Sequence, residues 1–412
     1  MKKITQIEGK PVKIYAEILE NQAFEQFKKA MRHPNILQGA LMPDAHTGYT
    51  LPIGGVVASK DYIFPSFIGY DIGCGMSAIK LNLKKHEIEK LTKTIFHGIY
   101  DIIPTGFSKN KKPQNWNYKN IKRSKIVDNI MSKDGLYQIG TLGTGNHFIE
   151  ISYDENNQVW ITIHSGSRGL GHTTATYYMK LAAFNNNEFV KDLQAKHEKL
   201  HKSDEGKFAI KVIEEFENQF KHLKATEGYF GFETNSVIGK QYIDDMNFCL
   251  EFALENRKIM IEKVAKYIYS VVGKPIQFQF NDSFINRNHN HADLKDGLRI
   301  HRKGATHAEE GMMGIIPGNM RDGSFVVRGL GNQDSLFSSS HGAGRVLSRN
   351  AAKESIHLKT FQNSMEGIIA KVGRSTIDES PFAYKDIFQV MKLQKDLVKV
   401  IHHLKPLINI KA

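Results

Sequence analysis

The spacing of apolar and polar residues predicts a chain that alternates strands with helices. Short β-branched runs predict strands at 12–14, 55–59, 77–83, 148–153, 159–164 and 276–280. Helical periodicity is expected over 16–31, 84–97 and 122–132, and it dominates 173–272, most clearly at 240–271. Residues 294–349 alternate strands with glycine turns, and 350–412 predict helices with a short terminal strand. We therefore expect an α/β (α+β) fold, one domain over 1–412 with a mostly helical insertion at about 173–272.

Glycine-rich turns at strand ends interrupt this pattern. Residues 42–59 read M-P-D-A-H-T-G-Y-T-L-P-I-G-G-V-V-A-S, too rich in proline and glycine for a helix, and predict a loop and a turn before the strand at 55–59. Similar turns occur at 67–76 (F-I-G-Y-D-I-G-C-G-M) and 140–147 (G-T-L-G-T-G-N-H). Because loops held at strand ends commonly carry function, we expect the chemistry of the chain on these turns.

Composition limits the classes of protein to consider. The chain has 412 residues, of which 41% are hydrophobic and 24% charged, as in an ordinary soluble protein. Two cysteines exclude a disulfide framework and indicate a reducing compartment. We find neither a signal peptide nor a bilayer-spanning run, so a cytoplasmic protein without a membrane partner is expected. We expect a monomer, since there is no strong coiled coil or exposed apolar repeat.

The net charge of +13 favours a polyanionic partner such as a nucleic acid. The basic residues are spread along the chain, however, and a basic composition also serves solubility. Charge alone therefore leaves both interpretations open.

Asp71 and Cys74 form a D-x-x-C motif inside the turn at 67–76. The motif offers a carboxylate and a thiolate to one point, a combination that suits borderline divalent metals and admits a harder ion such as Mn²⁺. The alternative is a small buried cysteine in a tight turn, which is the commoner role of a free cysteine.

Four histidines lie in comparable settings, at strand-to-turn junctions or in polar loops: His147, His164, His289 and His341. Singly, each is compatible with a hydrogen-bonded structural histidine. Together with the D-x-x-C motif they predict a ligand set for two divalent ions that share the sulfur. The remaining histidines that we considered lie on helix-like, mostly Lys-rich stretches and are expected to be solvated: His86, His97, His197, His201, His402 and His403.

Two serine-rich turns suggest phosphate binding. The segments 165–169 (S-G-S-R-G) and 338–345 (S-S-S-H-G-A-G-R) combine hydroxyls, backbone N–H groups and a guanidinium. A glycine-rich turn by itself usually marks only a tight bend. His341 lies within the second segment and is therefore a candidate nucleophile toward phosphorus. The chain has no G-x-x-x-x-G-K-[S/T] and no K-x-D-G motif, which excludes an ordinary lysine-adenylating ligase.

A series of motifs in this order resembles the RtcB family of RNA ligases. The motifs are M-P-D-A-H-T-G-Y, P-I-G-G-V-V-A, G-Y-D-I-G-C-G-M, G-T-G-N-H-F-I-E, H-S-G-S-R-G-L-G, H-R-K-G-A-T, I-P-G-N-M and S-S-S-H-G-A-G-R. The resemblance extends from about Met42 to Lys411. It implies a GTP- and Mn²⁺-dependent enzyme that joins an RNA 3′-phosphate or 2′,3′-cyclic phosphate end to a 5′-hydroxyl end, in RNA repair or tRNA splicing. Some members of the family use the activating protein archease, which makes archease a candidate partner.

The resemblance also implies roles for individual residues. His341 would attack GTP and carry GMP, and Cys74 would bridge two Mn²⁺ ions, with Asp71 and His147 on one ion and His164 and His289 on the other. Arg168 would meet an RNA phosphate, and Asp44 and His46 would support the site without binding metal. The implied nucleotide contacts are Asn146, Glu150, Asn319, Ser324, His341, Gly342, Ala343, Gly344, Tyr384 and Lys411.

The chain departs from the commonest family pattern at three places. Thr50–Leu51 replaces Gly-Phe, His307 replaces an arginine, and 319–322 (N-M-R-D) replaces S-M-G-T. The last two are expected near the nucleotide and RNA surfaces, where they would affect substrate preference. Two other functions remain open: a dinuclear metal phosphoesterase acting on RNA cyclic phosphate ends, which would not need His341 as a nucleophile, and a non-catalytic RNA-binding protein, which would need only the charge.

Overall fold

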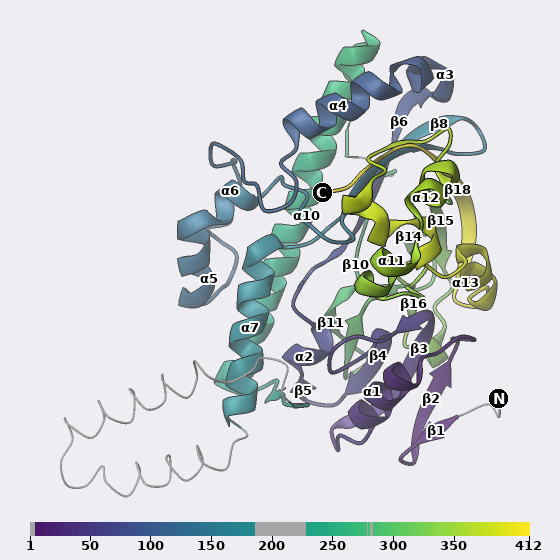
Figure 1. Cartoon of the computed structure of the whole chain (residues 1–412). Helices are drawn as coiled ribbons and strands as arrows, with labels where there is room; N and C mark the ends of the chain where they lie inside the picture. Colours follow the sequence, from purple (N-terminus) through teal and green to yellow (C-terminus); the bar gives the residue numbers. More distant parts are fainter. Residues whose placement is uncertain (1–4, 186–227, 278, 281–282) are drawn as a thin grey trace, which may run out of the picture.

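The computed structural model describes residues 5–185, 228–277, 279–280 and 283–412, and it contains two large β-sheets (Figure 1). The smaller of the two has six strands, and only its β2–β3 pair is parallel. Its order is β1 (Gln6–Ile7), β2 (Lys10–Ile14), β3 (Ile36–His46), β4 (Ile53–Ser59), β12 (Leu298–Lys303) and β11 (Asn290–Lys295).

The larger sheet has eight strands and is antiparallel apart from its short β17–β18 pair. Its order is β10 (Ile285–Asn288), β6 (Gly75–Lys84), β8 (Gln158–Ser165), β7 (Phe148–Tyr153), β18 (Val398–Ile410), β15 (Ser324–Gly329) and β14 (Met313–Pro317), with β17 (Ile369–Ala370) beside β18. Two further pairs are β13 (Ala305–His307) with β16 (Ser338–Ser340) and β5 (Tyr62–Ile63) with β9 (Phe232–Glu233).

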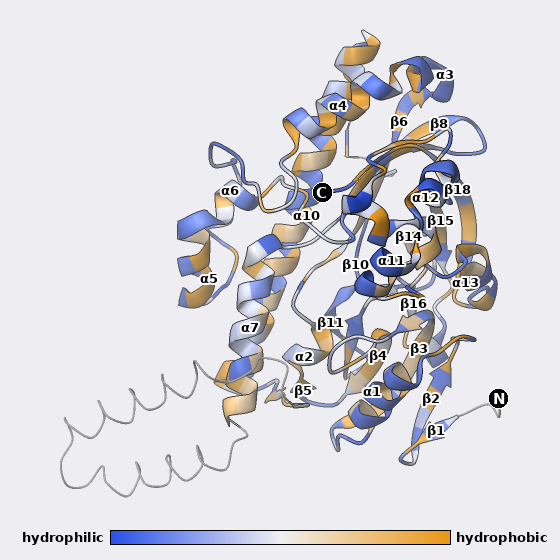
Figure 2. Cartoon of the chain, viewed as in Figure 1, coloured by the Kyte–Doolittle hydropathy of each residue, from blue (hydrophilic) through white to orange (hydrophobic). Residues whose placement is uncertain are grey.

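The long helix α10 (Val237–Val272) packs against the large sheet and against two other helices. It packs on β8, and α4 (Thr92–Ile102) and α7 (Arg168–Asn185) lie beside it (Figure 1). The second half of the apolar stripe expected at 240–271, from Met260 onward, shares one core with Ile161 and Ile163 of β8. The first half packs in another core together with buried residues of α7. Figure 2 shows the matching hydrophobic residues along β6, β8 and β18. No helix among the described residues is long and apolar enough to cross a membrane.

The other helices are short. They are α1 (Asn21–Met31), α2 (Pro65–Ile68), α3 (Lys85–Ile88), α5 (Lys125–Ile130), α6 (Leu136–Gln138), α11 (Arg349–Ser355), α12 (Leu358–Ser364) and α13 (Ile387–Leu393). A π-helical turn occupies Met131–Gly135, and 3₁₀ turns occupy Glu89–Leu91, Gln333–Ser335, Arg374–Glu379 and Pro381–Ala383.

The expected mixture of strands and helices is confirmed, and the strands expected at 55–59, 77–83, 148–153 and 159–164 form with boundaries within two residues. Three expectations were wrong. Residues 42–46 belong to β3, where a register shift between Leu41 and His46 accommodates Pro43 in the strand. The helix expected over 16–31 begins only at Asn21, and the described residues of 276–280 form no strand.

The end of the chain also differs from expectation. Instead of a short strand, β18 extends over 13 residues between β7 and β15. It carries His402 and His403, which we expected on a solvated helix; the His403 ring stacks on Phe325 at 4.5 Å, and the His402 ring lies 5.9 Å from Trp160. His86 and His97 are exposed as expected, whereas His197 and His201 lie outside the described residues.

Candidate metal centre and nucleotide pocket

The predicted metal ligands lie together at one end of four neighbouring strands of the large sheet. Because β6, β7, β8 and β10 are antiparallel neighbours, the starts of β6 and β7 lie beside the ends of β8 and β10. The register pairs Gly75 with Ser165 and with Asn288, and Phe148 with His164. Cys74, His147 and His289 are each adjacent in sequence to a paired residue, and His164 is itself paired. Positions separated by more than 200 residues in sequence therefore lie at the same end of these strands.

The side chains at this end of the strands point their ligand atoms at one another. Cys74 Sγ lies 3.4 Å from His147 Nε2 and 3.2 Å from His164 Nε2. Asp71 Oδ2 is 3.1 Å from His147 Nε2, and His164 Nε2 is 3.3 Å from His289 Nε2. The two groupings that these contacts form, Asp71–Cys74–His147 and Cys74–His164–His289, share the sulfur.

Three of these residues, Cys74, His147 and His164, are buried and could hold a metal ion. The other nitrogens of two rings face backbone carbonyls, His147 Nδ1 on Leu142 O at 2.9 Å and His164 Nδ1 on Asn146 O at 3.2 Å, so Nδ1–H donates and the Nε2 lone pair is available. Burial, together with neighbouring rings, lowers the pKa of His164 and His289 well below the ordinary value, which keeps both neutral. The Nε2 atoms of His164 and His289, 3.3 Å apart, can share at most one hydrogen. Both nitrogens can instead bind a cation through their lone pairs.

The carboxylate and the thiol of the cluster behave differently. Burial opposes ionisation of Asp71, but the His147 hydrogen bond and charge outweigh it, and the net pKa is lowered. Burial and the nearby Asp71 charge raise the pKa of the Cys74 thiol well above its ordinary value. A metal ion would reverse that effect, since a coordinated thiol is deprotonated.

A buried arginine from α10 fixes the position of the turn that carries Cys74. Arg257 Nη1 donates to Gly73 O at 3.0 Å and to Ser165 O at 2.7 Å, and its Nη2 donates to Asn288 Oδ1 at 2.7 Å. One guanidinium thus joins the ends of β6, β8 and β10. We did not select this residue from the sequence, although an arginine on the apolar face of a helix was the available signal.

The turn at 165–169 has a structural role that differs from the one expected. The hydroxyls of Ser165 and Ser167 donate to Leu142 O and Ile72 O, so they are not free for phosphate. Arg168 has a φ of +59° at the start of α7 and donates to Thr141 Oγ1 at 3.0 Å and to Gly106 O at 2.8 Å. Gly143 must lack a side chain, because its φ is +98° and an added Cβ would overlap the Arg168 guanidinium and the His147 ring.

His341 follows β16 and lies between the metal ligands and a pocket. Its ring centroid is 4.8 Å from that of His289. Its Nδ1 is 2.7 Å from Asp44 Oδ2, and the same oxygen accepts the backbone N–H of His341 at 3.1 Å and of Gly342 at 3.2 Å. Burial opposes ionisation of Asp44, but the charge and hydrogen bond of His341 lower its pKa overall. These contacts are consistent with the expected supporting role of Asp44. His46 contacts the backbone of Asp44, with Nδ1 2.8 Å from Asp44 O.

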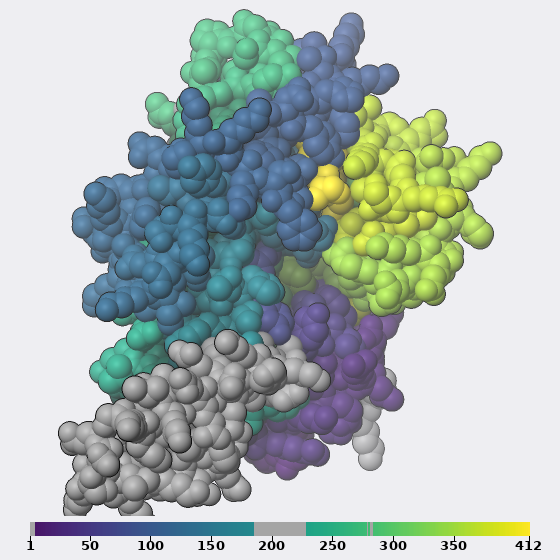
Figure 3. Space-filling model, turned by 60° about the vertical axis from the view of Figure 1, so that its left-hand side comes forward, coloured from purple at the N-terminus to yellow at the C-terminus, as the bar shows by residue number. Residues whose placement is uncertain are grey.

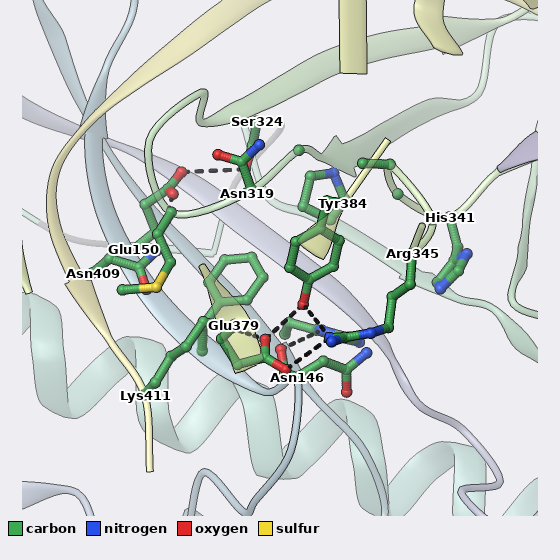
Figure 4. Close-up of a pocket in the computed structure, with 18 of the residues that line it drawn as sticks. Asn146, Glu150, Asn319, Ser324, His341, Arg345, Glu379, Tyr384, Asn409 and Lys411 are labelled. Carbon is green, nitrogen blue, oxygen red and sulfur yellow. Dashed lines mark hydrogen bonds and ion pairs between the residues drawn. The ribbon is translucent and has the colours of Figure 1, made fainter. Parts of the chain in front are cut away.

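A pocket of about 320 Å³ opens beside His341 (Figure 4). All ten residues that the family resemblance assigns to the nucleotide line it. Figure 3 shows the end of the chain, in yellow, at a recess between the blue surface of the first half and the yellow-green surface of the last quarter. The serines at 338–340, which we expected to hold phosphate, instead lie buried in β16 and do not line the pocket.

Two buried glutamates in this pocket differ in ionisation, Glu150 favouring the neutral acid and Glu379 the carboxylate. Burial raises the pKa of Glu150 to about 8, although hydrogen bonds from Ser324 and Asn409 oppose the rise. The pKa of Glu379 falls to about 2, because Lys411 and Arg349 outweigh the effect of burial. Lys411 Nζ and the Tyr384 hydroxyl each lie 2.6 Å from Glu379 Oε2. Lys411 is therefore buried and paired, although a terminal lysine is ordinarily solvated.

Sequence reasoning missed several residues of the pocket. Glu379 lies in the 3₁₀ turn Arg374–Glu379, where no motif marks it. Arg345, within the quoted S-S-S-H-G-A-G-R motif, has Nη1 3.3 Å from Glu379 Oε1, and Arg349 Nη1 is 2.7 Å from the same oxygen. Asn409 Nδ2 is 3.3 Å from Glu150 Oε2. The spacing of these residues carries no local periodicity that could have indicated them.

A second histidine cluster lies away from the pocket and contains His307, one of the departures from the family pattern. Its Nε2 is 2.5 Å from His291 Nε2, and its Nδ1 is 3.2 Å from Glu309 Oε1. The fully buried guanidinium of Arg302 donates to Asp293 and lies 3.4 Å from His291 Nε2. His307 does not line the nucleotide pocket, whereas Asn319 and Met320 of the other departure do.

Comparisons with known proteins agree along the whole chain. The family profile described as "tRNA-splicing ligase RtcB" matches residues 26–131 and 115–412. The RNA-splicing ligase RtcB of Escherichia coli K12 is 34% identical over 431 aligned positions, covering 98% of each chain. The tRNA-splicing ligase RtcB of Nanoarchaeum equitans is 28% identical, covering 98% of this chain and 96% of its own, and that of Thermococcus kodakarensis is 25% identical, covering 96% and 94%.

Proposed function

This chain belongs to the RtcB family of RNA-splicing ligases, and from that premise we propose that it joins RNA ends with GTP and Mn²⁺ through a guanylylated His341. Its substrates are an RNA 3′-phosphate or 2′,3′-cyclic phosphate end and a 5′-hydroxyl end, produced by tRNA splicing or by RNA damage. The observation that carries the proposal is the placement of His341 between the metal ligands and the pocket, with Nδ1 held by Asp44 at 2.7 Å.

Asp44 prepares His341 for attack on phosphorus. A buried carboxylate that accepts from Nδ1–H leaves the lone pair on Nε2, as in other hydrogen-bonded catalytic histidines. The same carboxylate oxygen accepts two backbone N–H groups, so one oxygen holds both the loop after β16 and the ring. Nε2 attacks the α-phosphorus of GTP, pyrophosphate leaves, and a phosphoramidate with GMP results.

Two groups of side chains supply the metal ligands. We assign Asp71, Cys74 and His147 to one Mn²⁺, and Cys74, His164 and His289 to the other. When bound, the ions would neutralise the triphosphate and the departing pyrophosphate. The chain contributes three imidazoles, the sulfur shared by both groupings and the carbonyl contacts that orient His147 and His164.

The pocket beside His341 provides the nucleotide site. Its nearest segment, 342–344, presents glycines and an alanine to the phosphates, and Asn319 and Ser324 line the same cavity. A protonated Glu150 would donate a hydrogen bond as well as accept one, and the cationic surroundings of Glu379 keep that carboxylate ionised. Together they offer donors and acceptors to a guanine edge, with Tyr384 and Lys411 fixing Glu379 in place.

The second half of the reaction joins the RNA ends. Water first opens a 2′,3′-cyclic phosphate end, breaking the P–O2′ bond to leave a 2′-hydroxyl and a 3′-phosphate. An oxygen of the 3′-phosphate attacks the phosphorus on His341, the N–P bond breaks, and an RNA–GMP anhydride forms. The 5′-hydroxyl then attacks the activated 3′-phosphate and releases GMP. Arg168 is the side chain we assign to the RNA phosphate, because it lies beside the Asp71 and Cys74 turn.

An end-joining assay tests this proposal. The wild-type protein, GTP and Mn²⁺ are incubated with one RNA that ends in a 3′-phosphate and one that begins with a 5′-hydroxyl, with archease added in a parallel reaction. We expect a joined product that His341→Ala does not form. A wild-type protein that hydrolyses cyclic phosphate ends without joining them, and an equally active His341→Ala variant, would favour the metal phosphoesterase instead.

A further inference from the structure

Three rings from separate segments meet beside the metal ligands. Tyr49 follows β3, Tyr70 precedes Asp71, and His172 lies in the first turns of α7. The Tyr49 and Tyr70 rings are perpendicular at 5.8 Å, and the Tyr70 and His172 rings are stacked at 5.1 Å with 19° between their planes. Tyr49 is 63% exposed and His172 is exposed, so both outer rings present surface to solvent, while the half-buried Tyr70 packs against the core.

The position of these rings relates them to the reacting ends. Tyr70 and Asp71 are consecutive, and the Asp71 side chain is 34% exposed, which makes this the open side of the metal cluster. His172 follows Arg168 by one helical turn, so both extend from neighbouring positions of α7. None of the three rings lines the nucleotide pocket. A molecule that contacts the rings therefore reaches the metal ligands without occupying the site assigned to GTP.

A buried lysine amine lies beside the Tyr49 ring of this cluster. Lys303 Nζ is 5.9 Å from the centre of the Tyr49 ring, and the residue is only 6% exposed. Its hydrogen-bond acceptor is Ser66 O at 3.5 Å, and within the described part of the chain no carboxylate forms an ion pair with it. Burial lowers the pKa of Lys303 to about 7. A phosphate group nearby would supply the negative charge that the chain does not.

We propose that Tyr49, Tyr70 and His172 form a stacking platform for an unpaired base of the RNA end held at the metal cluster. This inference rests on the proposed ligase function. Single-stranded RNA is commonly bound by stacking its bases on aromatic side chains, while cationic groups follow the backbone. Rings that pack only for stability would be covered, whereas Tyr49 offers an open edge with the Lys303 amine 5.9 Å from the ring centre.

The platform is tested by removing a ring or removing a base. The ring variants are Tyr49→Ala and His172→Ala, with Tyr49→Phe as the conservative form and Phe388→Ala as an exposed aromatic control on α13. The substrates are matched RNAs, normal or with an abasic ribose as the terminal nucleotide of the 3′-phosphate strand or of the 5′-hydroxyl strand. Two quantities are measured: the KM for RNA in end joining, and GMP attachment to His341 in the absence of RNA.

We expect Tyr49→Ala and His172→Ala to raise the KM for RNA by about 5-fold or more, the usual effect of removing one stacking ring. GMP attachment without RNA should be unchanged, and Tyr49→Phe and Phe388→Ala should resemble the wild type. The abasic substrate should raise the KM of the wild type but not the KM of Tyr49→Ala, and the strand whose abasic form does so identifies the end that is bound.

Two results would overturn the platform. One is a Tyr49→Ala variant that stays as sensitive to the abasic ribose as the wild type. The other is a KM for RNA that is the same in Tyr49→Ala, His172→Ala and the wild type. Failure of the ligase function itself gives a different signature, a wild-type protein that neither attaches GMP nor joins RNA.

Discussion

The two histidine clusters contain similar side chains but differ in the source of their positive charge. At Cys74, ring nitrogens of His147, His164 and His289 lie within 3.4 Å of a sulfur or of another ring nitrogen. The nearby Arg257 guanidinium donates to backbone carbonyls and to Asn288. At His307, the guanidinium of Arg302 lies among the rings and two carboxylates. The second cluster thus has a cation of the chain among its rings, and at the first cluster we propose that a metal ion takes this place.

The same contrast distinguishes two glutamates of one pocket. Glu379 is surrounded by Lys411, Arg345 and Arg349 and has a pKa of about 2. Glu150, equally buried, is hydrogen-bonded mainly to neutral groups and has a pKa of about 8. Buried polar groups that the chain leaves without a counter-charge are the groups we expect a ligand to complete.

The largest effect should come from removing the shared sulfur. Cys74→Ala takes one ligand from both metal groupings, so bound Mn²⁺ and GMP attachment should fall below detection, a loss of more than about 10³-fold. Elemental analysis of the purified protein and radiolabelled GTP measure the two quantities. The control is His307→Ala in the second cluster, which should retain both. Equal loss of metal in the two variants would remove the distinction between the clusters.

A loss of GMP attachment without a loss of metal is expected when Asp44 keeps its shape and loses its charge. Asp44→Asn can still contact Nδ1, but its amide can present N–H and favour the wrong tautomer, so GMP attachment should slow by about 10²- to 10⁴-fold. Bound Mn²⁺ should stay at the wild-type level, because Asp44 contacts no assigned ligand. Rapid-quench measurement of the attachment step, with metal analysis of the same sample, checks both statements. A variant that attaches GMP at the wild-type rate would contradict the role of Asp44.

Arg302 should matter for stability rather than for chemistry. Arg302→Met leaves Asp293 and Glu309 without their cation, and since these carboxylates are 30% and 20% exposed the cost should be about 2–4 kcal/mol, somewhat below that of a fully buried pair. Urea unfolding measures this cost. Lys13→Met, which removes an exposed 3.0 Å pair with Asp334, should cost less than about 1 kcal/mol. Added Mn²⁺ that restored the Arg302→Met variant would show that the second cluster also takes an ion.

Glu150 predicts a pH dependence with a definite sign. Its pKa is raised from 4.5 to about 8 on folding, so between these values unfolding releases a proton and stability falls as the pH rises. Glu150→Gln removes that slope. Its stability relative to the wild type should therefore increase by up to about 1.4 kcal/mol per pH unit between pH 5 and pH 8. Urea midpoints of both proteins without nucleotide provide the test, and parallel pH profiles would mean that Glu150 is ionised when the protein is folded.

Much of the candidate site could be predicted from the sequence, because the local setting of its residues distinguishes them. Asp71, Cys74 and the four histidines stand out as polar side chains in glycine-rich turns, and strand register then brings them together. Arg257 and Glu379 could not be found in this way, since their roles depend on which distant carbonyls and cations surround them after folding. The serines at 165, 167 and 338 suggested phosphate binding wrongly, because local composition does not reveal that a hydroxyl already donates to a backbone carbonyl.

We propose above all that GMP becomes attached to His341, which lies between the metal ligands and the pocket. The most direct test is to incubate the protein with GTP and Mn²⁺, without RNA, and to locate any attached GMP by peptide mass mapping. We predict an acid-labile GMP on the peptide containing His341 in the wild type and none in His341→Ala. GMP on another residue, or consumption of GTP by the wild type with no adduct while Mn²⁺ is bound, would contradict the claim.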